Sequence, residues 1–228
     1  MQAAQGPQKD PVVLAAGEEH VQFCFDVLSS HFSGSSGPVA YFDEAVCPLF
    51  VTWNKEDRRG GTRLRGCIGT LQARNLRTAL REYALTSSLK DRRFPPVTSK
   101  ELPLLHCTVS LLSAFEQAQD WLSWVIGLHG LIIEFDDHMT GHKRSATFLP
   151  EVAAHENWTQ QQTIDALIRK AGFSGSVTDD LRSSLRITRY RSTTASLTYA
   201  EYMQRVMSSN ELQTQMKVAS PSCVPVPA

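Results

Sequence analysis

One stretch of the sequence, residues 63–71, reads RLRGCIGTL and combines strand-forming residues with two glycines, two arginines and a thiol. In a strand, successive side chains point to opposite faces, so this spacing places Arg65 and Cys67 on one face and Ile68 on the other. Gly66 and Gly69 flank the thiol, which suggests a bulge or a place where another group approaches the backbone closely. We therefore expect the fold and a candidate site to be organised around this stretch.

Cys67 is the candidate for chemistry within it. A neighbouring cation favours the thiolate, which is the reactive form of cysteine, so Cys67 is a candidate nucleophile or redox-sensitive group. The alternative is structural, because a reduced cysteine often packs in a core as a small apolar residue. A catalytic pairing would need a base, for which His129 and His106 are the candidates, and sequence separation does not choose between them.

The segments next to this stretch predict a hairpin and a helix. Alternating apolar residues at 47–53 indicate a strand that pairs with residues 63–71 across a charged loop. Asn75 is placed to cap a following helix with a row of arginines, which we interpret as a solvated face, an anion site being the alternative. The arginines of this row are Arg74, Arg77 and Arg81. Two prolines, Pro95 and Pro96, then fix an extended corner that presents Asp91, Arg92 and Arg93.

The rest of the chain alternates between helices and strands joined by hairpins. A helical stripe covers residues 17–32, and strand patterns cover 105–112, 131–135 and 185–191, with a hairpin tip at 136–142. Capping boxes at 98–101, 159–162 and 198–201 open further helical segments. Because several strands are joined by hairpins and not by helical crossovers, we predict an α+β fold with a mixed or antiparallel sheet and packed helices.

Composition narrows the function classes. The 23 Lys and Arg residues balance the 23 Asp and Glu residues, so no overall charge attracts nucleic acid or an anionic membrane. The five cysteines, at 24, 47, 67, 107 and 223, form no CxxC pair, and no signal peptide or membrane-spanning run is found. We expect an intracellular protein, cytoplasmic or nuclear. Residues 1–16 and 208–228 are predicted to be disordered tails around a domain at 17–207.

A series of motifs in order resembles the AMMECR domain family, in its eukaryotic form. The motifs are LFVTW at 49–53, RLRGCIGT at 63–70, KDRRFPP at 90–96, GLHG at 127–130, TFLPEVA at 147–153 and TRYRS at 188–192. The resemblance implies a compact α+β domain of two subdomains, with the 63–70 motif near a cleft and no established catalytic activity. It also implies prokaryotic relatives associated with Memo-type and radical-SAM proteins.

Two functions follow from these observations. The first is a regulatory or protein-interaction module with a ligand or partner cleft at Arg65, Gly66, Ile68 and Gly69 and at the corner formed by Arg92, Arg93 and Phe94. The second is an enzyme, or a former enzyme, in a modification pathway that uses Cys67, with His129 as its candidate partner. Whether the chain is an enzyme stays open. No nucleotide, nicotinamide or zinc motif is present, so we predict no cofactor and no metal. We expect a protein partner or a small anionic ligand, and neither nucleic acid nor a membrane.

Overall fold

The chain was analysed as a computed structural model, which describes residues 14–57, 60–138 and 140–218, with side chains described as far as Ser209. It contains two compact units. The larger unit comprises residues 16–109 and 195–218, and the smaller unit comprises residues 14–15 and 110–194. Strands β3 (Leu105–Gln117) and β6 (Arg186–Thr198) contribute residues to both units. The strand order along the sheet is β2-β1-β3-β6-β4-β5.

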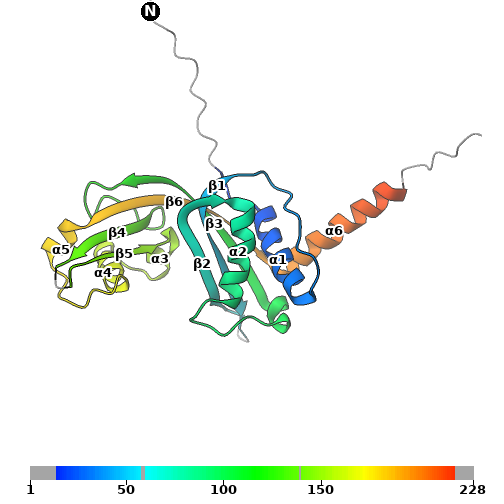
Figure 1. The fold of residues 1–228 in the computed structure, drawn as a ribbon, viewed down its shortest axis with the longest axis horizontal. Coiled ribbons are helices and arrows are strands. Elements are labelled where there is room, and N and C mark those ends of the chain that lie inside the picture. Colours follow the sequence, from blue (N-terminus) through cyan, green and yellow to red (C-terminus); the bar gives the residue numbers. More distant parts are fainter. Residues whose placement is uncertain (1–13, 58–59, 139, 219–228) are drawn as a thin grey trace, which may run out of the picture. The chain divides into compact units, whose positions relative to one another are not determined.

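The larger unit is built on an antiparallel hairpin. Strand β1 (Val46–Glu56) pairs with β2 (Thr62–Asn75), which is an edge strand. Alternate β1 side chains, those of Leu49, Val51 and Trp53, are fully buried, as expected for a strand with one face on the core. Helix α2 (Leu76–Leu89) packs against both strands (Figure 1), and its Ala84 carbonyl accepts a hydrogen bond from the Trp53 indole at 3.2 Å.

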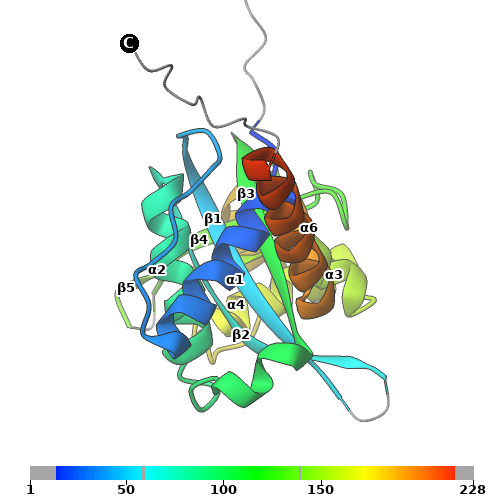
Figure 2. The same cartoon turned by 90° about the vertical axis from the view of Figure 1, so that its right-hand side faces the viewer.

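Two further helices complete the larger unit. Helix α1 (Glu18–Ser33) lies beside α6 (Tyr199–Val218), as Figure 2 shows. The Phe25 and Tyr202 rings stack with centroids 4.9 Å apart, and the Tyr202 hydroxyl donates to the Asp26 carboxylate at 2.8 Å. A 3-10 helix, η1 (Ser99–Leu104), leads into β3.

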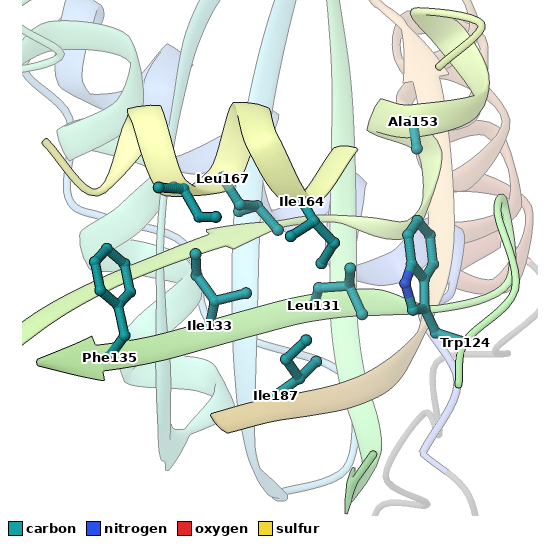
Figure 3. Close-up of a cluster of buried hydrophobic side chains, with 9 residues drawn as sticks. Trp124, Leu131, Ile133, Phe135, Ala153, Ile164, Leu167 and Ile187 are labelled. Atoms are coloured by element: carbon teal, nitrogen blue, oxygen red, sulfur yellow. The ribbon is translucent and has the colours of Figure 1, made fainter. Parts of the chain in front are cut away.

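The smaller unit is a second hairpin covered by a helix. Strand β4 (Gly130–Asp137) pairs antiparallel with β5 (His142–Phe148) on one side and with β6 on the other. Helix α4 (Gln160–Lys170) buries its apolar stripe on this sheet (Figure 3), with short helices α3 (Pro150–His155) and α5 (Asp179–Ser184) beside it. The buried side chains of this core are those of Trp124, Leu131, Ile133, Phe135, Ala153, Ile164, Leu167, Ile168 and Ile187.

The prediction of an α+β fold with an antiparallel or mixed sheet is confirmed, and the two units match the two subdomains that the resemblance implies. The predicted capping boxes at Thr98–Glu101 and Thr159–Gln162 are present. Helix α6 continues to Val218, beyond the predicted domain limit at 207. Residues 1–13 and 219–228 lie outside the described residues, so the disorder of the tails stays a prediction. No described helix is both long and apolar enough to span a membrane.

Candidate functional site

A bulge in β2 changes the direction of Arg65. Trp53 lies opposite Gly66 and Asn54 opposite Leu64, so Arg65 is the extra residue in the β2 register. The prediction that Arg65 shares a face with Cys67 is therefore wrong, because a one-residue bulge interrupts the alternation on which it rested. Arg65 is 7% exposed and binds the same carboxylate as Lys55, a residue two positions along β1 from the buried Trp53.

The Arg65 side chain links β2 to the double-proline corner through hydrogen bonds. Its guanidinium contacts both oxygens of Glu101, at 3.0 and 3.1 Å, and the carbonyl oxygens of Pro95 and Pro96, at 2.7 and 3.2 Å. Burial alone would raise the pKa of Glu101, but hydrogen bonds from Arg65 and Lys55 outweigh it and lower this pKa to about 2. Every nitrogen of the guanidinium donates to the chain itself, so Arg65 positions the site instead of offering a free charge to a ligand.

Cys67 lies where the corner covers the edge of the sheet. In an edge strand, alternate residues point their backbone N–H and C=O groups away from the neighbouring strand. The Cys67 N–H donates to the Asp91 carboxylate at 2.9 Å, and the Cys67 carbonyl accepts from the Arg93 guanidinium at 3.1 Å. Arg93 also binds Asp91, through Nε at 2.9 Å and Nη2 at 2.6 Å. This ion pair replaces a neighbouring strand at Cys67, and we call these three residues the edge cap.

The edge cap favours the charged forms of both Asp91 and Arg93. Asp91 is 5% exposed, and its hydrogen bonds from Arg93 are the main reason that its pKa falls to about 2, assisted by the N–H of Cys67. The pKa of Arg93 is raised by the same pair, with a smaller contribution from Cys67. Both groups are therefore ionised at neutral pH.

The thiol of Cys67 is half-buried and accepts a hydrogen bond from the Thr52 hydroxyl, with 3.1 Å between Oγ1 and Sγ. Thr52 is its partner in the β1–β2 register. The other three cysteines of the described part, Cys24, Cys47 and Cys107, are buried, and none of the four forms a disulfide. Burial raises the pKa of Cys47, and burial together with the neighbouring Cys24 raises the pKa of Cys107. Cys67 therefore differs from them in exposure and in having both a hydroxyl donor and a nearby guanidinium.

Backbone carbonyl groups from other parts of the chain lie close to both glycines of the motif, Gly66 and Gly69. A Cβ on Gly66 would lie 1.9 Å from the carbonyl oxygen of Ser87 in α2. A Cβ on Gly69 would lie 2.2 Å from the carbonyl oxygen of Leu49 in β1. The predicted close approach is thus found, but α2 and β1 supply it and no ligand is required to explain these two positions.

The other predicted binding residues differ in accessibility. Ile68 is half-buried opposite Val51, Arg92 is exposed and Phe94 is half-buried. The Arg93 side chain is 55% exposed, and its guanidinium carbon lies 5.4 Å from the centre of the Phe94 ring. Arg92, Arg93 and Phe94 thus form an accessible corner beside Cys67, whose use by a partner or an anion stays a prediction.

The arginine row, with Arg74 at the end of β2 and Arg77 and Arg81 on α2, is structural. Arg77 donates to the Phe42 carbonyl at 3.0 Å from Nε, and Arg81 donates to the Pro38 carbonyl at 2.5 Å. Arg74 pairs with Glu82 at 2.8 Å. The interpretation of Arg77 and Arg81 as a solvated face is therefore incorrect, and these side chains hold the loop that follows α1 against α2.

His129 belongs to the smaller unit, whereas Cys67 belongs to the larger one. His129 is 7% exposed, and its Nδ1 accepts a hydrogen bond from the Val125 N–H at 3.0 Å. Burial lowers its pKa, and the positive charges of Arg189 and Arg191 lower it further. Its pairing with Cys67 stays a prediction. The other candidate base, His106, lies within 2.8 Å of Glu56 through its Nε2.

Sequence reasoning missed the roles of Asp91 and Glu101. Both carboxylates were visible next to motif residues, but their partners lie 24 and 36 positions away in the sequence. Among the residues that the structure describes, no group of three or more His, Cys, Asp and Glu side chains is arranged to hold a metal ion.

Comparisons with known proteins agree with this fold. A sequence profile described as AMMECR1 matches residues 21–195. An uncharacterized protein of Arabidopsis thaliana is 51% identical over 86% of this chain and 92% of its own length. An uncharacterized protein of Schizosaccharomyces pombe is 37% identical over 83% of this chain and 96% of its own length. A crystal structure of an uncharacterized protein from Pyrococcus horikoshii superposes with a TM-score of 0.62 at 23% identity, covering 78% of this chain and 89% of that chain, which shows the fold alone.

Replacing Gly66 with alanine should destabilise the protein. The new Cβ would meet a helix backbone oxygen, so α2 or β2 must shift, and we expect the free energy of unfolding to fall by about 2 kcal/mol or more. Gly61→Ala is the matched control, because the nearest atom there, at 3.0 Å, ends the flexible side chain of Asp57. Denaturant midpoints measure both changes, and a Gly66→Ala protein as stable as the Gly61→Ala protein would show that the helix does not approach this closely.

Replacing Asp91 with asparagine should remove a pH-dependent part of the stability. The folded-state pKa of about 2 lies below the unfolded value of roughly 4, so the carboxylate stabilises the fold above about pH 4 and ceases to do so as the pH falls towards 2. We expect the stability difference between the parent and Asp91→Asn to shrink by on the order of 2 kcal/mol over this interval.

Urea titrations at several pH values test this expectation. Arg92→Gln changes an exposed neighbour that donates no hydrogen bond to Asp91 in the described contacts, so its stability should follow the parent curve at a constant offset. A parent-to-Asp91→Asn difference that is constant from pH 7 to pH 2 would contradict the edge cap.

Proposed function

The chain belongs to the AMMECR1 family, and we propose that it acts as a regulatory protein-interaction module whose partner binds the corner formed by Arg92, Arg93 and Phe94, next to Cys67. The observation that carries this proposal is a fixed, accessible corner: Arg92 is exposed, and the Arg93 guanidinium, which is bound to Asp91, lies 5.4 Å from the centre of the Phe94 ring. Arginine and aromatic side chains are enriched among the residues that dominate binding energy at interfaces.

The rigidity of the corner supports the same proposal. The Arg93 N–H donates to Asp91 at 3.1 Å, the Phe94 N–H donates to the Asp91 carbonyl at 3.0 Å, and Arg65 holds the following prolines. A surface that is ordered before binding loses less conformational entropy when a partner docks. Most of the motif, including Arg65, Gly66 and Gly69, then serves to hold this surface in place.

The charges of the corner indicate the chemistry of the partner. Asp91 neutralises Arg93, while Arg92 is exposed. An acidic side chain next to an apolar one on the partner would complement Arg92 and Phe94, and a small carboxylate or phosphate ligand would use the same cation. A protein partner is favoured because it also covers the ring of Phe94.

The interaction proposal predicts that Arg92→Glu combined with Phe94→Ala abolishes partner binding without unfolding the protein. Both side chains lie outside the ion pair between Asp91 and Arg93, so the edge cap stays intact. We expect binding of the proteins that the parent chain captures to fall roughly tenfold or more. Arg63→Glu, an exposed charge reversal elsewhere on β2, is the control. Equal capture by the double variant and the parent would exclude this corner as the binding surface.

A second candidate function, chemistry at Cys67, is favoured by the Thr52 hydroxyl at 3.1 Å from the sulfur and by the guanidinium of Arg93 near the same residue. Both groups would stabilise a thiolate over a thiol. Under this proposal Cys67 is a nucleophile or redox-sensitive group, and the accessible arginines orient an anionic substrate.

The thiol proposal predicts that Cys67 reacts with iodoacetamide roughly tenfold faster or more than Cys24 and Cys107, which are fully buried. Thr52→Val should slow the Cys67 reaction at neutral pH, because it removes the hydroxyl that donates to the sulfur. Mass spectrometry of the labelled native protein measures the three rates separately. Equal rates for the three thiols, or a Thr52→Val protein that reacts as fast as the parent, would remove the basis for chemistry at this residue.

A further inference from the structure

A cavity of about 350 Å³ lies within the smaller unit, at the end of β4 and next to α5. Its lining includes Asp136 and His138 from the β4 end, Phe173 from the loop after α4, and Asp180 and Leu181 from α5. This volume falls in the range of sites that hold small organic molecules. The lining contains none of the edge-cap residues and none of the corner residues Arg92 and Phe94, so the cavity is a separate feature of the molecule.

The floor of the cavity is apolar and supported from beneath. Phe173 packs edge-to-face on Phe135, with ring centroids 5.9 Å apart and planes at 81°. Leu181 packs against the same buried core. Because core residues hold both side chains, the aromatic and aliphatic surface is present before any ligand binds, and covering it would remove apolar area from water.

The charged groups of the lining are mostly acidic. Asp137 is neutralised by Arg144, whose Nε lies 2.6 Å from Oδ2, and Asp136 is 3.8 Å from Arg186. Asp180, in contrast, makes no ion pair within the described part of the chain. Among the described residues of the lining there is no lysine or arginine. The lining therefore combines apolar side chains with the exposed carboxylate of Asp180, which has no guanidinium or ammonium partner among the described residues.

We propose that this cavity binds a small amphipathic cation, that is, a protonated amine carried on an apolar body. The ammonium group would face Asp180 and the hydroxyl of Ser176, and the apolar body would rest on Phe173 and Leu181. A carboxylate attracts such a group through a charge-assisted hydrogen bond, and the face of an aromatic ring attracts cations as well. This ligand site lies in a different unit from the proposed partner surface and is independent of it.

The proposal is tested with three probes of similar shape on the full chain: 2-phenylethylamine, the neutral 2-phenylethanol and the anionic 3-phenylpropionate. Chemical-shift changes in amide NMR spectra at low salt report both affinity and location. We expect the amine to shift the amides of Phe173, Asp180 and Leu181 and to bind at least roughly fivefold more tightly than the alcohol. The carboxylate should bind more weakly than the alcohol.

Two variants separate the charge from the shape of the cavity. Asp180→Asn should reduce amine affinity roughly fivefold while leaving alcohol affinity unchanged. Ser176→Phe, at an exposed position of the lining, should fill the cavity and abolish binding of all probes. Glu134→Gln, an exposed acidic residue on β4 outside the lining, is the matched control and should bind like the parent. Equal affinity for amine and alcohol, or amine binding unaffected by Asp180→Asn, would overturn the proposal, as would an absence of shifts at millimolar probe.

Discussion

The larger unit depends on how one edge of its sheet is closed. Among the described strands, β2 has no neighbour on its outer side. Without another partner, the outward-pointing backbone groups of Cys67 would hydrogen-bond to water or to another chain. The Asp91 carboxylate and the Arg93 guanidinium satisfy both of them, at 2.9 and 3.1 Å. Two sequence motifs that are separated by α2 are joined at this point. The glycine-rich strand and the double-proline corner are therefore a single structural element.

Arg65 and Glu101 make the second connection of this element. A buried arginine is costly unless its donors are satisfied, and here a carboxylate and two backbone carbonyls satisfy them. The bulge at Arg65 directs the side chain toward these partners, and Gly66 beside it leaves room for the carbonyl of Ser87 in α2. The residues that looked most like ligand-binding groups in the sequence thus fix the strand, the helix and the corner relative to one another. What they leave accessible is Arg92, Arg93, Phe94 and the thiol of Cys67.

Local patterns in the sequence predicted much of the fold. Alternation identified the β1–β2 hairpin, Asn75 identified the start of α2, and capping boxes identified η1 and α4. The bulge could not be predicted in this way, because it depends on the register with β1, and it reversed the side of the sheet assigned to Arg65. The partners of Arg65 and Cys67 were also hidden, since an ion pair across 36 positions and a hydrogen bond across 24 positions leave no local signal. The sequence of the six-residue helix α5 is too short to show a helical pattern of apolar residues. The cavity beside α5 is formed by segments that are distant in the sequence, so it is recognised only in the folded chain.

The account of this element rests on the edge cap formed by Cys67, Asp91 and Arg93. Hydrogen exchange at the Cys67 amide tests it most directly. At neutral pH the amide should exchange slowly in the parent and rapidly in Asp91→Ala. The Ile68 amide, which points toward β1, should stay protected in both proteins. A Cys67 amide that is equally protected with and without the Asp91 carboxylate would show that the corner does not close this edge.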